Sequence, residues 1–243
     1  MIYTEQVRSI ILQTTFLILL LVLSSCSTVT VHDEKEADFH YKMGIASLGE
    51  GNLQSAFVEF QKTLQLDPNY KDALINLGYI HLQFEEFEKA KGLFLRAISI
   101  DPQFSDAYTY LGITYIKMHQ WKEAVEPLKK ALSNVLYKSP GKAFYYLGMA
   151  YYRMGLFDNA MDAFKDSIKR SPSAPEAYYG ISLTYNKTGR YGDAAAMIER
   201  ALAIDPAFNS DKAKFISEMK QSLLTSKGED ETDTRDYLEI MKY

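Results

Sequence analysis

The sequence predicts an all-α solenoid built from five helical repeats and closed by a C-terminal capping helix. Glycine recurs along the chain at spacings of 34, 34 and 36 residues, at Gly44, Gly78, Gly112 and Gly148. Self-similarity at this period is typical of stacked two-helix units. Asp-Pro pairs stand near the expected end of the second helix in three repeats. Because proline lacks an amide donor and disfavours helical geometry in the residue before it, these pairs are expected to end helices.

The second helix of each repeat carries its own signature. An alanine is followed four residues later by a bulky residue, at Ala56 and Phe60, Ala90 and Phe94, Ala124 and Leu128, Ala160 and Phe164, and Ala194 and Ile198. This pattern resembles the tetratricopeptide repeat, and the resemblance implies a right-handed superhelix. We expect the repeats over residues 37–70, 71–104, 105–140, 141–174 and 175–208. The signature residues are expected to be scaffold, and Trp121, in the register of Phe87 and Phe157, is expected to pack rather than to bind a ligand.

The first 26 residues differ in pattern from the repeats. An apolar stretch over residues 10–23, too short and too interrupted to span a bilayer comfortably, precedes Ser24, Ser25 and the only cysteine, Cys26. The segment 23–26 resembles a bacterial lipobox, which implies a signal peptide over residues 1–25, acylation of Cys26 and a lipidated tether over residues 26–36. A buried structural cysteine is the alternative. Ser27 stands where an aspartate would favour inner-membrane retention, so the resemblance implies the periplasmic face of the outer membrane.

Composition and residue inventory argue against several classes of function. The formal net charge of −4 disfavours nucleic acid, whose binding needs a basic surface. The histidines are scattered singly along the chain, at His32, His40, His81 and His119. Metal sites need clustered ligands, and no phosphate-binding glycine loop is present. We therefore expect no catalytic residues, no metal and no cofactor, and the chain is expected not to be an enzyme.

What remains is recognition of a protein partner. In tetratricopeptide repeats the concave surface is lined by fixed positions of each first helix, and here many of these positions are apolar or tyrosine. The predicted partner-binding groove comprises Tyr41, Ile45, Leu48, Ile75, Tyr79, Leu82, Tyr145, Tyr152 and Tyr179. Such a surface suits a helix or an extended peptide held by a few aromatic anchors. The alternative is that neighbouring repeats or the C-terminal tail fill it.

The third repeat is two residues longer than the first two, over the stretch 134–140. Leu136, Tyr137 and Pro140, together with Cys26, resemble the pilotin-like lipoproteins of type IV pilus biogenesis and stability. That resemblance implies a secretin or pilus subunit as partner and membrane attachment through N-terminal acyl chains. The plain alternative for the insertion is a lengthened helix end or loop that packs locally. The alternative function is a general periplasmic adaptor that recruits cell-wall hydrolases or synthases.

The C-terminal part divides in two. Residues 209–225 carry apolar side chains at helical spacing, at Ala213, Ile216, Met219 and Leu223, which predicts a capping helix with its apolar face on the last repeat. Residues 226–243 begin with an acidic run and are expected to form a loosely ordered acidic tail. Residues 237–241 are expected to add at most one short helical turn.

Overall fold

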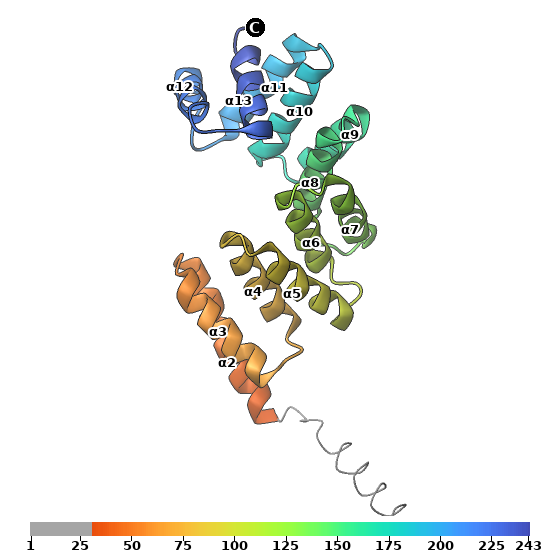
Figure 1. The fold of residues 1–243 in the computed structure, drawn as a ribbon, viewed down its shortest axis with the longest axis vertical. Coiled ribbons are helices and arrows are strands. Elements are labelled where there is room, and N and C mark those ends of the chain that lie inside the picture. Colours follow the sequence, from red (N-terminus) through yellow and green to blue (C-terminus); the bar gives the residue numbers. More distant parts are fainter. Residues whose placement is uncertain (1–30) are drawn as a thin grey trace, which may run out of the picture. The chain divides into compact units, whose positions relative to one another are not determined.

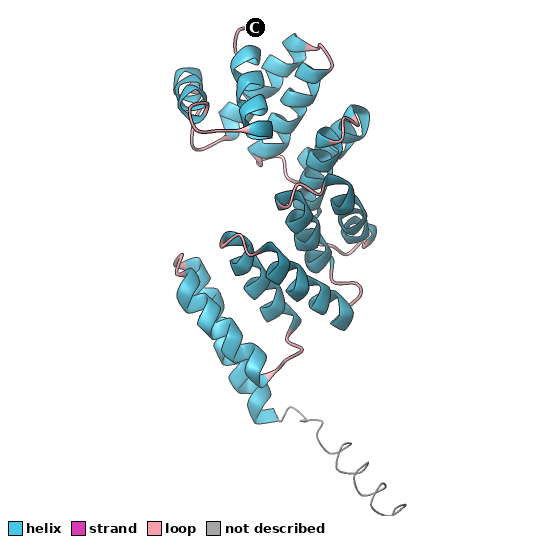
Figure 2. Cartoon of the chain, viewed as in Figure 1, coloured by secondary structure: helices cyan, strands magenta, loops and turns pink. Residues whose placement is uncertain are grey.

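The computed structural model describes residues 31–243, and all regular structure in this range is helical (Figures 1 and 2). The prediction of an all-α solenoid is confirmed for this part of the chain. The signal peptide predicted over residues 1–25, and Cys26 itself, lie outside the described residues. The chain divides into two compact units, Met1–Tyr70 and Lys71–Tyr243, which are described separately below.

The described part of the first unit, residues 31–70, contains one helix pair, α2 (Val31–Gly49) and α3 (Leu53–Leu66). The Asn52 side chain caps α3 by accepting a hydrogen bond of 3.0 Å from the amide of Ser55. The two helices pack closely, and a Cβ placed on Gly44 would lie 2.5 Å from Cε1 of the buried Phe60. Because α2 already begins at residue 31, the described part of the predicted tether is helical, and the first helix is longer than the repeat pattern indicated.

The second unit contains four further pairs and two additional helices. Their bounds are α4 (Lys71–Gln83), α5 (Phe87–Ile100), α6 (Ser105–Lys117), α7 (Trp121–Ser133), α8 (Pro140–Arg153), α9 (Phe157–Arg170), α10 (Pro175–Lys187), α11 (Tyr191–Ile204), α12 (Lys212–Ser222) and α13 (Gly228–Ile240). The pairs α4–α5, α6–α7, α8–α9 and α10–α11 correspond to the second to fifth predicted repeats, and each also packs on the next (Figure 1).

Phe164 shows how the small residues of the repeat pattern serve the core. Its ring is fully buried on α9. A Cβ on Gly148 of α8 would lie 2.6 Å from Cδ1 of this ring, and a Cβ on Gly180 of α10 would lie 2.5 Å from Cζ. Both distances are far inside van der Waals contact, so three helices meet around one aromatic ring only because two of them carry glycine there.

The two-residue insertion lies between α7 and α8 and combines local packing with exposure. The hydroxyl of Tyr137 lies 3.0 Å from that of Thr109 on α6, and burial raises the pKa of the tyrosine above its ordinary value. Asn134 fastens the start of the loop by donating to the carbonyl of Gln103 over 3.2 Å. Val135 and Leu136, by contrast, are 94% and 82% exposed. Tyr137 therefore has the packing role given by the plain alternative, whereas Leu136 does not.

The C-terminal region departs from the sequence-based expectation. The predicted capping helix exists as α12, but its buried residue is Phe215, while Ala213 is exposed and Ile216 and Met219 are half-buried. The apolar face is thus rotated from the predicted one. The expectation of a loosely ordered tail is wrong, because residues 228–240 form helix α13, which packs on α10, α11 and α12 (Figure 1).

Candidate functional site

Helix α13 lies against side chains that were predicted to line the partner-binding groove. The Tyr152 hydroxyl donates to Oδ1 of Asp233 over 3.3 Å, and the ring of Tyr179 lies 5.8 Å from that of Tyr237. Tyr145 and Tyr237 pack against the same buried apolar cluster. The structure therefore brings together the three predicted groove tyrosines of the fourth and fifth repeats, and it places a helix of the same chain on them.

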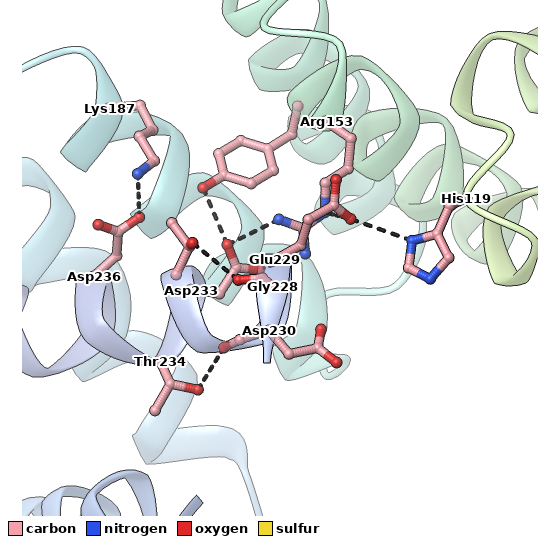
Figure 3. Close-up of polar contacts among 11 residues, drawn as sticks. His119, Arg153, Lys187, Gly228, Glu229, Asp230, Asp233, Thr234 and Asp236 are labelled. Carbon is pink, nitrogen blue, oxygen red and sulfur yellow. Dashed lines mark hydrogen bonds and ion pairs between the residues drawn. The ribbon is translucent and has the colours of Figure 1, made fainter. Parts of the chain in front are cut away.

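Two short charged contacts, made by Asp233 and Asp236, hold α13 on this surface (Figure 3). Arg153, at the end of α8, donates from Nη1 to Oδ1 of Asp233 over 3.0 Å and from Nη2 to Oδ2 over 2.7 Å. These side chains are only 10% and 13% exposed, respectively. At the end of α10, Lys187 Nζ lies 2.6 Å from Oδ2 of Asp236. A bidentate arginine–carboxylate pair adds geometric specificity as well as attraction, so α13 is held in one register.

The apolar contacts lie beside these pairs on the same face of α13. Tyr237 packs edge-on against Phe215 of α12 at 5.9 Å between ring centroids, and Phe215 in turn stacks on Tyr179 at 5.8 Å. Ile240 is fully buried, in a cluster with Ile198 of α11. The helix is therefore anchored by charged contacts near its middle and by burial of apolar surface towards its C-terminal end.

Burial shifts the pKa values of the tyrosine and aspartate side chains between α13 and the groove. It raises the pKa of Tyr237 well above the ordinary tyrosine value, and it raises the pKa of Tyr152, where the neighbouring Asp233 adds to the effect. Burial also raises the pKa of Asp233, with the hydrogen bonds from Arg153 acting in the opposite direction. The tyrosines therefore remain neutral at physiological pH and act as apolar surface and hydrogen-bond donors.

A cavity continues the groove beyond the N-terminal end of α13. Its walls include Ile116, Trp121 and Met149, with Arg153 and Glu229 at the boundary to the helix. The Arg153 guanidinium lies 6.0 Å from the Trp121 ring, within the outer range of a cation–π contact. The surface that α13 uses is thus one part of a longer concave region within the second unit.

The predicted groove residues of the first two repeats have several environments. In the first unit, Tyr41 packs on Phe60 and Tyr70, with ring centroids 5.8 and 4.8 Å apart. Ile45 is 41% exposed and Leu48 is half-buried.

In the second repeat, the predicted groove residues are more enclosed. Ile75 and Leu82 are 7% and 9% exposed, and the half-buried Tyr79 has its ring 6.0 Å from that of Tyr110. Among these three residues, Tyr79 is therefore the one with appreciable surface.

Two histidines outside this site each contact a glutamate carboxylate. His40 Nδ1 lies 2.6 Å from Oε2 of Glu59, and His81 Nδ1 lies 2.5 Å from Oε2 of Glu86. Within residues 31–243 no three histidine, cysteine or acidic side chains gather in a geometry that could hold a metal ion. Over the same range, no helix combines the length and the apolar character needed to cross a bilayer.

Four charged residues of the site were missed by sequence reasoning, namely Arg153, Lys187, Asp233 and Asp236. A signal for the last two was present, because Asp233, Asp236, Tyr237 and Ile240 follow the i, i+3, i+4, i+7 spacing of one helix face. The pattern was not recognised because two of its four positions are aspartates, whereas a buried helix face is normally apolar. Their cationic partners lie about 80 and 49 residues earlier in the sequence, and no local pattern connects them.

Comparison with known proteins places the fold. Sequence models described as tetratricopeptide repeat match residues 47–103, 93–126, 111–175 and 145–207. Superkiller protein 3 of Schizosaccharomyces pombe is 28% identical over 181 residues, which is 71% of this chain but only 13% of that relative. The chain thus spans a small part of the length of this curated relative.

Solved structures with the same fold cover most of the chain. PilF of Pseudomonas aeruginosa superposes with a TM-score of 0.67 at 19% identity, covering 85% of this chain and 98% of PilF. PilW, described as a widely conserved type IV pilus biogenesis factor, gives 0.66 at 19% identity and covers 80% and 96%. MamA gives 0.57 at 25% identity and covers 74% and 96%. The five helix pairs, the glycine contacts between them and these matches show that the chain belongs to the tetratricopeptide-repeat family.

Proposed function

We propose that this chain is a non-enzymatic scaffold that holds a protein partner on the concave surface of its repeats. One observation carries the proposal: the surface formed by α8 and α10 already holds a helix, through two charged pairs and buried tyrosines. A surface that binds α13 in this way has the chemistry to bind a helix of another protein. Tetratricopeptide repeats serve protein–protein interaction, which agrees with this chemistry.

A more specific proposal concerns the cellular location of the protein and the identity of its partner. In it, Cys26 carries acyl chains, the chain sits on the periplasmic face of the outer membrane, and it assists assembly of a type IV pilus or its secretin. The lipobox resemblance and the residues Leu136, Tyr137 and Pro140 support this reading. The fold that the chain shares with PilF and PilW also supports it.

A general periplasmic adaptor is the second candidate. In this case the same surface would recruit cell-wall hydrolases or synthases to the envelope without any role in pili. The fold is shared with MamA, at 25% identity, as well as with the two pilus proteins, at 19%. The fold alone therefore does not select a pilus partner.

Fractionation of bacterial envelopes tests the anchor. We expect Cys26→Ala to leave helical circular dichroism unchanged and to release the protein from carbonate-washed membranes, because two or three acyl chains are its only proposed attachment. Ser27→Asp keeps the cysteine and is expected to move the protein from outer-membrane to inner-membrane fractions on a density gradient. Retention of the Cys26→Ala variant in washed membranes would contradict the lipid anchor.

A crosslinked pull-down from native envelopes tests the partner. The lipidated wild type is compared with Tyr41→Ala and Tyr79→Ala, made separately, and with Leu95→Ala as a matched control, since Leu95 is a 46% exposed apolar residue of a second helix. Secretin or pilus subunits that are recovered with the wild type and the control, but lost with a tyrosine variant, would support the pilus role. Cell-wall enzymes recovered without secretin would support the general adaptor.

A further inference from the structure

We propose that the groove between α8 and α10 binds an acidic amphipathic helix of a partner protein, and that α13 occupies this groove while no partner is bound. The inference rests on the proposed scaffold function and specifies the chemistry of its ligand. It starts from α13 itself, which serves as a bound example of what the surface accepts (Figure 3).

The contacts of α13 define the spacing that a ligand helix needs. An acid pairs with Arg153, and a second acid, three residues later, pairs with Lys187. An aromatic residue follows directly and packs on Tyr179, and an aliphatic residue three positions further is fully buried. At 3.6 residues per turn these four positions lie on one face. The groove therefore selects a helix with acids at positions 1 and 4, an aromatic residue at 5 and an aliphatic residue at 8.

The charged contacts favour exchange over permanent attachment. Arg153 and Asp233 are largely buried as a pair, and the loss of hydration offsets much of the attraction between such ions. The pair thus specifies which helix binds more than it adds to stability. A helix of 13 residues is also marginal on its own in water, so α13 remains folded chiefly while it is docked.

The connection between α12 and α13 allows the helix to leave. Residues 223–227 link the two, and Leu224 in this link is 85% exposed. None of the helix pairs α4–α5 to α10–α11 depends on α13 for its own pairing, because each pair is formed by helices adjacent in sequence. Undocking α13 therefore exposes the groove without unfolding the repeats.

A partner helix can make contacts that α13 does not. The cavity lined by Ile116, Trp121 and Met149 begins at the N-terminal end of α13. His119 also lines it, with Nδ1 3.5 Å from Oε2 of Glu229. A longer helix would extend its N-terminal turn into this space. These additional contacts oppose the advantage that tethering gives α13, whose effective concentration in the groove is on the order of millimolar for a short flexible link.

Fluorescence anisotropy with a labelled peptide of residues 226–243 tests the proposal in the full-length chain. The double variant Tyr237→Ala/Ile240→Ala removes the apolar anchors of α13 and is expected to bind the peptide about tenfold or more tightly than the wild type, because the tethered helix no longer competes. Circular dichroism checks that the repeats remain helical. Binding no tighter than that of the wild type, with the repeats intact, would overturn the proposal.

A charge exchange tests the register. In the same double-variant background, Arg153→Glu is expected to weaken binding of the peptide at least tenfold, and a peptide with Asp233→Arg is expected to restore it. A peptide with Glu239→Arg is the matched control, since Glu239 is an exposed residue of α13 outside the four contact positions, and it should bind the unaltered groove as before. Equal binding of all three peptides to the Arg153→Glu chain would overturn the assigned contacts.

The helix in the groove could also come from a second copy of the chain, and sedimentation distinguishes this case. If the wild type sediments as a dimer and the double variant as a monomer, α13 serves the groove of a second copy, which overturns the proposal of a foreign partner helix. Failure of the peptide experiments alone, with capture of envelope proteins still sensitive to Tyr41→Ala or Tyr79→Ala, would remove this inference and leave the scaffold function standing.

Discussion

Gly148 is where a single added methyl group should disturb the packing of three helices. Its missing side chain makes room for the buried ring of Phe164, which a Cβ would approach to 2.6 Å. We expect Gly148→Ala to lower the free energy of unfolding by about 1–3 kcal/mol, because neither the ring nor the backbone has free space to move into. Urea unfolding followed by circular dichroism measures the change.

Gly92 provides the matched control for that substitution. It lies in α5 within the same unit, it is exposed, and a Cβ added there would meet no atom within 4 Å. Gly92→Ala is therefore expected to raise the free energy of unfolding by about 0.4–1 kcal/mol, since alanine has less conformational freedom to lose in a helix. Equal effects of the two substitutions would mean that helix propensity, and not contact with Phe164, decides the outcome.

Glu59 links the stability of the first unit to pH. Hydrogen bonds from Lys62, at 2.7 Å, and with His40, at 2.6 Å, lower its pKa below the ordinary glutamate value of 4.5. The unfolded chain then binds more protons than the folded chain between the two pKa values, so stability rises with pH in that window. The contribution of Glu59 is present above pH 4.5 and is lost as the pH falls through its lowered pKa.

Glu59→Gln tests this linkage. Thermal unfolding of wild type and variant is compared from pH 7 to pH 3, and the difference in stability is expected to be constant above about pH 5 and to shrink towards pH 3. Lys62→Met, which removes the larger cause of the lowered pKa, is expected to reduce the same pH-dependent difference. A difference that grows as the pH falls would contradict the assigned direction of the shift.

At the scale of elements, α7 carries a residue that helices normally avoid. Pro127 lies in its interior, where proline lacks the amide that would donate to the carbonyl of Glu123. Pro127→Ala supplies this donor and removes the ring, and we expect the melting temperature to rise, with a gain in stability of up to about 3 kcal/mol. Glu126→Ala, at an exposed neighbouring position, should change stability by less than about 0.5 kcal/mol. An unchanged melting temperature for Pro127→Ala would mean that the local geometry has adapted fully to proline.

The helices of the repeats were predictable from sequence because their signals are local. Glycine, alanine and the bulky residue of each pair recur at fixed spacing, and the structure places them in contact, as with Gly44 and Phe60. Helix α13 was not predictable in this way. Its acidic first turn suits a helix N-terminus, but the charges also fit a solvated tail, and only Arg153 and Lys187 decide between the two.

In the candidate site, too, the residues with local sequence signals were predictable and those fixed by long-range contacts were not. The tyrosines of the fourth and fifth repeats follow from the register of the first helices, so sequence alone could name Tyr145, Tyr152 and Tyr179. Their occupant could not be named, because it depends on how a helix near residue 235 packs on helices that end at residues 153 and 187. The apolar face of α12 was misjudged for a related reason, since Phe215 is buried by packing against Tyr179 and Tyr237.

At the scale of the whole molecule, the division into two compact units has a thermodynamic consequence. In repeat proteins, stability is approximately a sum of terms within repeats and between nearest neighbours, so a local defect is expected to remain local. Gly44→Ala places a Cβ 2.5 Å from the ring of Phe60, within the first unit. We expect amide exchange in α2 and α3 to become about five- to a hundredfold faster, and exchange in α8 to α11 to be unchanged.

Gly148→Ala is the reciprocal variant, since it creates the same kind of overlap in the second unit. Hydrogen exchange measured by mass spectrometry should then show faster exchange in α8 to α10, with α2 and α3 unaffected. If either substitution accelerates exchange equally in both units, the chain unfolds as one cooperative body and the additive description fails. If each effect stays within its own unit, changes to the first unit can be used to alter partner capture without disturbing the groove that holds α13.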